Sequence, residues 1–185
     1  GKPQAEKEYL DSLNILLWEM WNEKGNQIII NGKGKLTLTY DNGIIKASGN
    51  YEGGMQNGDW FFFHPNGVMD YQAVYKDNKR EGLFISYFED KKTKSKGFYK
   101  DDLKSGHWDF YRQNGKLEME GEFANGLRNG RWKYYNSETN KKEAEGDFLN
   151  DKESGTWEYW YKGGEKWKQG NYTQGTKQGL WTTWF

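Results

Sequence analysis

Bulky apolar residues recur along this chain at a nearly fixed interval. Trp60, Phe84, Trp108, Trp132, Trp157 and Trp181 follow one another at steps of 24, 24, 24, 25 and 24 residues. Each is preceded by an aromatic residue nine positions earlier and by a glycine two positions earlier. The aromatic residues are Tyr51, Tyr75, Tyr99, Phe123, Phe148 and Tyr172, and the glycines are Gly58, Gly82, Gly106, Gly130, Gly155 and Gly179. A constant period of this size is typical of repeat proteins, so residues 49–185 are interpreted as six repeats.

Each repeat contains two extended stretches separated by a short turn. Residues 116–123 alternate polar with apolar or small side chains, and residues 131–136 are rich in aromatics, as expected of strands. The positions between such strands hold residues that tolerate positive φ: Gly53-Gly54, Asp77-Asn78, Asp101-Asp102, Asn125-Gly126, Asn150-Asp151 and Gln174-Gly175. Further turns are predicted at Asn42-Gly43, Asn66-Gly67, Asp90-Lys91, Asn114-Gly115, residues 137–140 and Gly163-Gly164. The expected fold is therefore all-β, an elongated antiparallel meander of repeated β-hairpins.

The N-terminal part shows weaker versions of this pattern. Residues 18–48 are interpreted as two degenerate repeats, because Gly34, Leu36 and Gly43 reproduce one set of spacings, and Trp18, Trp21 and Gly25 reproduce another. Residues 1–17 are assigned to a linker or a short capping helix. Tyr9, Leu13, Leu16 and Leu17 have roughly helical spacing, which leaves both alternatives open.

Strand alternation predicts two aromatic columns on opposite faces of the sheet. Trp108 and Phe110 should point to one face, and Asp109 and Tyr111 to the other. The column of the regularly spaced tryptophans is the expected core. The second column either lines an exposed groove or is buried by curvature of the sheet. Its members nominated as a binding surface are Tyr87, Tyr111, Tyr135, Trp160 and Trp184.

Composition excludes several classes of function. The 27 basic and 27 acidic residues cancel and alternate in sign, which does not resemble a nucleic-acid-binding surface. No apolar run approaches the roughly 20 residues that a transmembrane helix needs. Cysteine is absent, which removes disulfides and thiol chemistry.

Candidate catalytic and metal-binding groups are few. His64 and His107 occupy different positions within their repeats, which gives no shared role. No nucleophile motif or phosphate-binding glycine loop is present. The carboxylates Asp101, Asp102, Asp151 and Glu153 fall in turns, where Asp commonly makes local hydrogen bonds, and their spacing does not match a Ca²⁺ loop. We therefore expect a non-enzymatic protein without a cofactor or metal site.

The segment Gly121–Tyr135, with its glycines at 121, 126 and 130 and Trp132, resembles the MORN repeat in the bacterial variant form of YwqK-type proteins. The resemblance implies a twisted array of β-hairpins used mainly as a protein–protein scaffold. It also implies two other roles: phospholipid contact, proposed for eukaryotic members, and binding of a partner protein as an antitoxin, the label of some bacterial members. A weaker similarity to the aromatic repeats of choline- and glucan-binding cell-wall proteins adds glycan binding in the cell envelope as an alternative.

These observations together predict a non-catalytic protein that binds a protein partner. The final residues, 180–185, form an uncharged aromatic strand, and an uncovered strand edge favours pairing with a second chain. Self-association is therefore expected through Trp181, Thr183 and Phe185. Gly1 is interpreted as a remnant of tag cleavage, which favours an exported bacterial protein, of the periplasm or cell envelope, whose signal segment has been removed.

Overall fold

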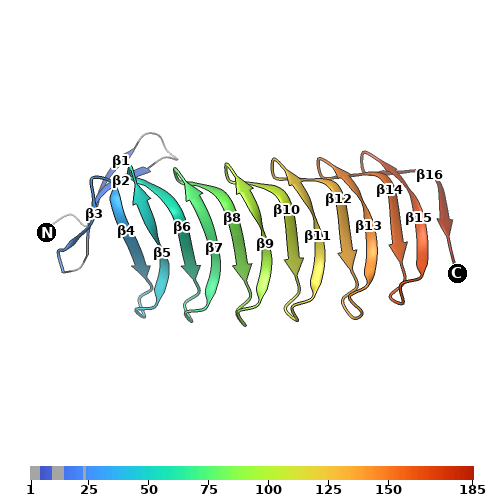
Figure 1. Cartoon of the computed structure of the whole chain (residues 1–185), viewed down its shortest axis with the longest axis horizontal. Helices are drawn as coiled ribbons and strands as arrows, with labels where there is room; N and C mark the ends of the chain where they lie inside the picture. Colours follow the sequence, from blue (N-terminus) through green and yellow to red (C-terminus); the bar gives the residue numbers. More distant parts are fainter. Residues whose placement is uncertain (1–4, 10–14, 23) are drawn as a thin grey trace. The chain divides into compact units, whose positions relative to one another are not determined.

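The structure, a computed structural model, describes residues 5–9, 15–22 and 24–185. These residues form sixteen strands and no helix, which confirms the all-β meander of hairpins. They divide into two compact units: one comprises the residues up to Lys91 together with Lys100–Asp102, and the other comprises Lys92–Tyr99 and Leu103–Phe185. Within each unit the strands lie in sequence order and are antiparallel (Figure 1).

The first unit contains the strands β1 (Ala5–Tyr9), β2 (Ile15–Trp21), β3 (Gln27–Ile30), β4 (Lys33–Thr39), β5 (Ile45–Glu52), β6 (Met55–Phe63), β7 (Met69–Lys76) and β8 (Lys79–Tyr87). The second contains β9 (Thr93–Lys100), β10 (Leu103–Tyr111), β11 (Leu117–Ala124), β12 (Leu127–Tyr135), β13 (Lys142–Leu149), β14 (Lys152–Trp160), β15 (Lys166–Thr173) and β16 (Thr176–Thr183).

The short turns have the backbone conformation that their sequences predict. At the turn between β11 and β12, φ is +51° at Asn125 and +81° at Gly126, and both residues of the equivalent turns in the other repeats also have positive φ. Two successive residues with positive φ characterise the type I′ turn, whose twist matches that of the strands it joins. The sequence therefore sets the register of each hairpin through its turn.

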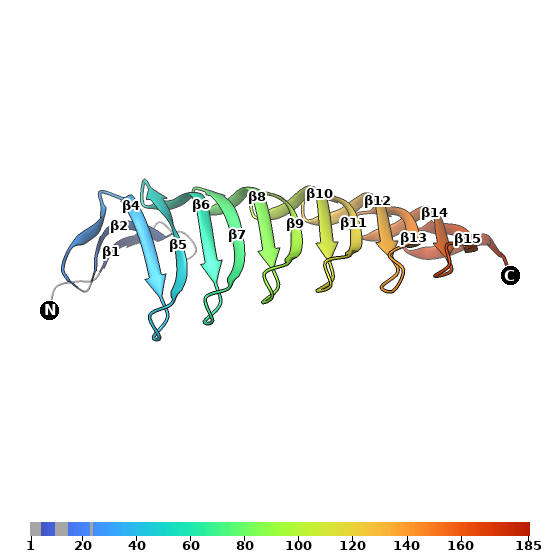
Figure 2. The same cartoon turned by 60° about the horizontal axis from the view of Figure 1, so that its bottom comes forward.

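The glycine two positions before each bulky residue marks a β-bulge. In the pairing of β11 with β12, Gly121 lies opposite Trp132, whereas the next residue, Glu122, lies opposite Asn129. The extra residues on β12 include Gly130, whose φ of +69° is accessible to glycine with little strain. Figure 2 shows that the strands bend along their length.

Tryptophan rings form the core, as predicted. Trp60, Trp108 and Trp132 are each 1% exposed. The aromatic residue nine positions earlier packs edge-on against each ring; for Phe123 and Trp132 the ring centroids are 5.1 Å apart and the planes make an angle of 86°. Edge-to-face packing is a preferred geometry for aromatic pairs and adds to the stabilisation from burial.

A glycine lies beneath each core tryptophan. A Cβ atom at Gly121 would come within 2.3 Å of Cδ2 of Trp132, and Gly49, Gly97, Gly146 and Gly170 have equivalent contacts with their own tryptophans. In the repeat in which Phe84 replaces tryptophan, the paired residue is Ala73. The larger tryptophan ring thus occurs opposite glycine, and the smaller phenylalanine ring occurs opposite alanine.

The indole N–H of most core tryptophans donates to a backbone carbonyl ten residues earlier. The distance from Nε1 of Trp132 to the carbonyl oxygen of Glu122 is 3.1 Å, and Trp60, Trp108 and Trp157 make the equivalent bond. Nε1 of Trp181 is buried without such a partner among the described residues. The final repeat therefore lacks a bond that the four other repeats with a core tryptophan share.

Turn residues also connect neighbouring hairpins. The backbone N–H of Asp151 donates to the carbonyl of Arg128, 3.0 Å away, and the backbone N–H of Arg128 donates to Oδ1 of Asp151, also 3.0 Å away. The same carboxylate oxygen accepts from Nε of Arg128 at 2.8 Å. Asp102 and Arg80 make the equivalent contacts in the first unit. These aspartates therefore have the structural role predicted for turn carboxylates.

The one-residue insertion of the 25-residue repeat lies in a loop. There the N–H of Asn140 donates to the carbonyl of Asn136, four residues earlier, whereas the N–H of Gly115 donates to Arg112, three residues earlier. Antiparallel pairing resumes at Tyr135 and Lys142, as it does at Tyr111 and Leu117. A wider turn thus accommodates the extra residue without changing the ladder.

The suggestion of a helix within residues 5–17 is wrong for the described part of that segment. Residues 5–9 belong to β1 and residues 15–17 to β2, while residues 10–14 lie outside the described residues. Leu16 and Leu17 are 8% and 7% exposed, and the N–H of Leu17 donates to the carbonyl of Gly54 at 2.8 Å. The turn of a neighbouring hairpin thus accepts a hydrogen bond from the backbone N–H of Leu17, and this tertiary contact outweighs the roughly helical spacing of the apolar residues.

Candidate functional site

The second unit has a face opposite its buried tryptophans, which we call the outer face. Because side chains alternate along a strand, Asp109 and Tyr111 point to the outer face, whereas Trp108 and Phe110 stack in the core with ring centroids 5.8 Å apart. Tyr135, Trp160 and Trp184 hold the positions equivalent to Tyr111 in their own repeats. These four rings are the part of the predicted binding surface that belongs to the second unit.

Charged side chains from adjacent strands partly cover these rings. The ammonium nitrogens of Lys96, Lys142 and Lys166 lie 5.9, 4.2 and 5.3 Å from the ring centroids of Tyr111, Trp160 and Trp184, respectively. Tyr111, Tyr135 and Trp160 are partly buried, and Trp184 is 37% exposed. The outer face is therefore a mixed aromatic and ionic surface and not a bare hydrophobic groove.

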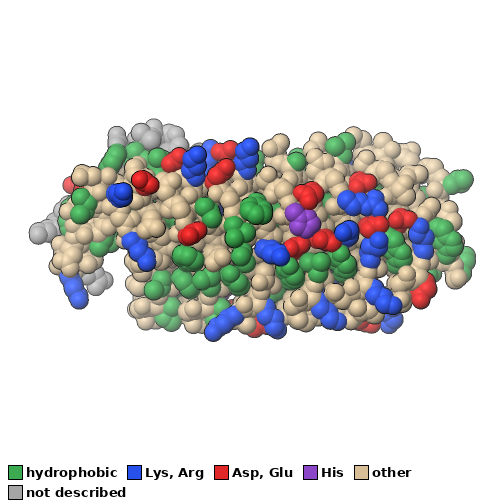
Figure 3. Space-filling view, viewed as in Figure 1, with side chains coloured by type: hydrophobic (Ala, Val, Ile, Leu, Met, Phe, Trp, Pro, Cys, Tyr) green, Lys and Arg blue, Asp and Glu red, His purple; other side chains and the backbone are tan. Residues whose placement is uncertain are grey.

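The ionic groups of the outer face form a connected network. Glu145, whose side chain is 12% exposed, lies 2.9 Å from Nη2 of Arg131 and 2.8 Å from Nζ of Lys142. Burial alone would raise the pKa of the Glu145 carboxyl, but the hydrogen bonds and charges of Lys142 and Arg131 outweigh burial and lower its pKa. On the face of the molecule seen in Figure 3, basic and acidic side chains are likewise interspersed.

Tyr135 is held by a second ionic group, formed by Glu120 and Lys133. Its hydroxyl donates to Oε1 of Glu120 at 2.6 Å, and Lys133 contacts that oxygen at 3.2 Å. Burial, followed by the hydrogen bond and charge of Glu120, raises the pKa of the Tyr135 phenol. The ring is therefore neutral over the physiological range and fixed in position.

Tyr87, the remaining residue of the predicted surface, belongs to the first unit. It is partly buried and lines a pocket of about 370 Å³ together with Phe63, Val68, Met69 and Lys91.

The residues predicted to mediate self-association lie at the end of the second unit. β16 pairs with β15, and its outer edge contacts no other strand among the described residues. Thr183 and Phe185 are exposed, whereas Trp181 is partly buried. The same edge exposes Leu180, which is 93% accessible.

Two consecutive segments of the periodic sequence match a known repeat family. The model of the MORN repeat variant matches residues 56–77 and 80–101. These two segments of the chain are MORN-variant repeats. The matched segments run from β6 into the turn after β7 and from β8 into the turn after β9, so each MORN repeat here begins on the second strand of one hairpin.

Other comparisons add no specific activity. No curated protein matches the chain. Among the described residues, no helix is long and apolar enough to cross a membrane. MORN repeats are commonly modules for interaction with proteins or membranes, which is the coarse function that the comparison supports.

Sequence reasoning missed one cluster of side chains on the outer face, beside the column of aromatic rings. Nε2 of His107 lies 3.0 Å from Oδ1 of Asp109 and 3.4 Å from Oε2 of Glu120. Partial burial lowers the pKa of His107, but hydrogen bonds with Glu122 and Asp109 outweigh burial, and the pKa is raised. The predicted hairpin register could have revealed the cluster, because the turn at Asn114-Gly115 places residues 107 and 109 opposite residues 122 and 120.

Proposed function

We propose that this chain is a non-catalytic scaffold that binds a partner protein through the outer face of its second unit. The observation that carries the proposal is the row of aromatic rings at repeat spacing, each at the end of a strand or directly after it and each next to a charged side chain. Aromatic residues with polar neighbours are enriched at protein interfaces, because they bury a large area at low cost in side-chain entropy. The alternating charges favour a partner surface that also carries both signs.

The same contacts weigh against glycan and membrane lipid as ligands of the outer face. Sugar binding requires open ring faces, but Lys142 lies 4.2 Å over the ring of Trp160, and Lys166 lies 5.3 Å over Trp184. Anionic membranes attract clusters of basic residues, whereas the cations here are paired with Glu145 and Glu158. A protein partner is compatible with both features.

Two tryptophans on one hairpin provide a matched test. Trp184 contacts Lys166 on the outer face and is 37% exposed, whereas Trp167 packs against Tyr159 on the opposite face and is 38% exposed. We expect Trp184→Ala to weaken retention of a protein partner at least tenfold and Trp167→Ala to leave retention unchanged. Both variants replace a tryptophan of nearly equal exposure, so a difference between their affinities reports which face of the sheet binds the partner.

The measurement is capture of proteins from source-cell extract on the immobilised chain, followed by titration of the purified captured protein against each variant. Parallel arms use insoluble cell-wall glycan and vesicles of anionic phospholipid. Equal affinity of both variants for the captured protein contradicts the proposed surface. Retention of glycan or vesicles without any protein contradicts the scaffold function itself.

A further inference from the structure

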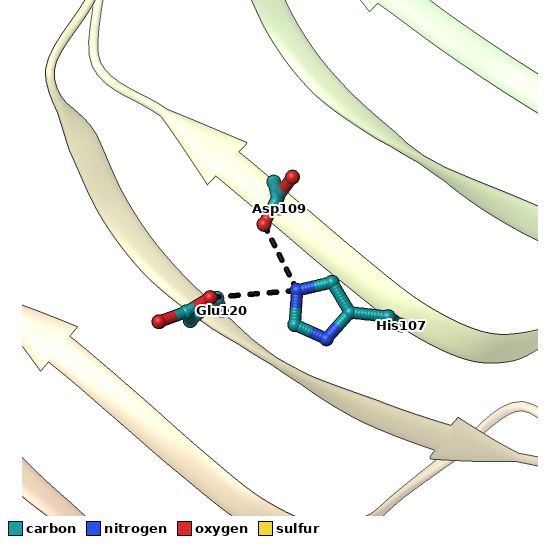
Figure 4. A group of neighbouring side chains, drawn as sticks. All are labelled: His107, Asp109 and Glu120. Carbon is teal, nitrogen blue, oxygen red and sulfur yellow. Dashed lines mark hydrogen bonds and ion pairs between the residues drawn. The ribbon is translucent and has the colours of Figure 1, made fainter.

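The cluster around His107 has the geometry of a metal site. Strands β10 and β11 pair so that residue 107 lies opposite 122 and residue 109 lies opposite 120, all on the outer face. One potential ligand atom each from His107, Asp109 and Glu120 lies within 4.8 Å of the other two. Figure 4 shows the imidazole directed between the two carboxylates.

We propose that His107, Asp109 and Glu120 bind a divalent transition-metal ion, for which Zn²⁺ is the best match. Zinc ligands lie about 2.0 Å from the ion and are arranged tetrahedrally, which separates the ligand atoms by about 3.3 Å. The distances from Nε2 of His107 are 3.0 Å to Asp109 and 3.4 Å to Glu120. Small side-chain movements therefore admit the ion.

The second nitrogen of the imidazole is already oriented. Nδ1 of His107 lies 3.1 Å from Oε1 of Glu122, which lets it donate its proton to that carboxylate. A carboxylate that accepts from the distal nitrogen of a histidine ligand fixes the tautomer and strengthens the ligand. Glu122 therefore leaves Nε2 as the coordinating atom.

Each carboxylate ligand is also held by its other oxygen. Oδ2 of Asp109 accepts from Lys96 at 3.1 Å, and Oε1 of Glu120 accepts from Tyr135 at 2.6 Å. The oxygens that face His107 are Oδ1 of Asp109 and Oε2 of Glu120. The side chains of Asp109 and Glu120 are only 14% and 18% exposed, which restricts their motion. The three potential ligand atoms thus lie within 4.8 Å of one another, and each side chain has a second contact that supports it.

The donor set selects the class of ion. One imidazole nitrogen with two carboxylate oxygens suits zinc and similar transition ions, whereas Ca²⁺ requires six to eight oxygens. Three protein ligands leave a tetrahedral ion with one position for water. Binding replaces the Nε2 proton of a protonated His107 with the metal ion, and the proton goes to the buffer.

The second histidine of the chain supplies the control. His64 lies 3.4 Å from Asp70, its side chain is 31% exposed, and no third potential ligand joins this pair among the described residues. In calorimetric titration of the full chain with ZnCl₂, we expect one site that His107→Gln and Asp109→Asn each weaken at least tenfold. His64→Gln should bind Zn²⁺ like the parent, and CaCl₂ should give no saturable binding.

Cobalt provides a second readout that does not depend on heat. Co²⁺ bound tetrahedrally should give visible absorption bands in the parent and His64→Gln proteins and none in His107→Gln. Circular dichroism checks that each variant keeps the parental fold. Parental Zn²⁺ affinity in His107→Gln, or equal weakening by the two histidine variants, overturns the proposal.

Discussion

The pairing of glycine with tryptophan across adjacent strands leads to a sharp prediction for the core. Gly121 lies opposite Trp132, and a Cβ at Gly121 would sit 2.3 Å from Cδ2 and 2.5 Å from both Cε2 and Cγ of that ring. Side chains in contact do not approach so closely, and Trp132 is only 1% exposed, so the ring has little room to move. Gly121→Ala should therefore strain the core.

The expected magnitudes follow from overpacking and from loss of contacts. Gly121→Ala should lower the free energy of unfolding by about 2 kcal/mol, as for an added methyl group in a tight core. Trp132→Phe should cost about 2 kcal/mol, because it leaves space and removes the hydrogen bond to the Glu122 carbonyl. If the two changes were independent, the double variant would lose about 4 kcal/mol. Because phenylalanine makes room for the methyl group, we expect a loss of only about 2 kcal/mol.

The first unit contains a natural example of alanine paired with phenylalanine in place of glycine paired with tryptophan. Ala73 lies opposite Phe84, at the positions that Gly121 and Trp132 hold in their repeat. Ala73 is 3% exposed, so its methyl group is accommodated where the ring is smaller. The converse variant, Phe84→Trp, should destabilise the protein and should be rescued by Ala73→Gly.

Urea unfolding followed by tryptophan fluorescence and circular dichroism measures all four proteins of the cycle. Gly130→Ala is the control, because φ at Gly130 is +69° but a Cβ there would meet its nearest atom only at 3.9 Å. Its cost of about 1–2 kcal/mol comes from backbone strain, and Trp132→Phe should not relieve it. A loss of about 4 kcal/mol in the Gly121→Ala/Trp132→Phe protein would refute the steric explanation.

Three further predictions concern other contacts and are measured by urea unfolding. Asp151→Ala removes the acceptor for Arg128 and places alanine at a φ of +66°, so it should lower the free energy of unfolding by about 1–2 kcal/mol. Asp151→Asn should lower it by less, and equal losses in the two variants would contradict this explanation. Glu145 has a folded pKa below its ordinary value of 4.5, so its contribution exists above that value and is lost as the pH falls through the folded pKa. Glu145→Gln should therefore be about 1 kcal/mol less stable than the parent at pH 7, and this difference should shrink as the pH is lowered through the folded pKa; a difference that stays constant down to acid pH would be inconsistent with linkage. Trp181→Phe should lower the free energy of unfolding by at least about 1 kcal/mol less than Trp132→Phe does, because only Trp132 loses a hydrogen bond and Trp181 is also less buried; similar losses would argue against that account.

The hairpins could be predicted because their determinants are local. Asn125-Gly126 permits only a narrow range of turns, and Gly130 marks the bulge two positions before Trp132. These signals recur with the same spacing in every full repeat, so six weak local patterns reinforce one another. The segment before the repeats lacks this reinforcement, and the spacing of its leucines fits both a helix and a strand. Contacts of Leu17 with Gly54 determine the outcome there, and they link residues far apart in the sequence.

The outer face was less accessible to prediction. Its aromatic column follows from strand alternation, but its ionic cover depends on cross-strand neighbours such as Lys142 over Trp160. The His107 cluster was missed because the two histidines were compared by repeat position, whereas its three ligands come from the two strands of one hairpin. Pairing the residues across the predicted turn would have placed Asp109 opposite Glu120.

The wider turn at residues 137–140 has a consequence for how such genes change. An inserted codon in that loop leaves Tyr135 and Lys142 paired, so it does not shift any downstream side chain from one face to the other. Unequal crossing-over that adds or deletes a whole 24-codon segment would likewise join strands whose turns and glycine–tryptophan pairs already match. Selection can therefore vary the number of hairpins in small steps, and with it the area of the outer face, without first redesigning the core.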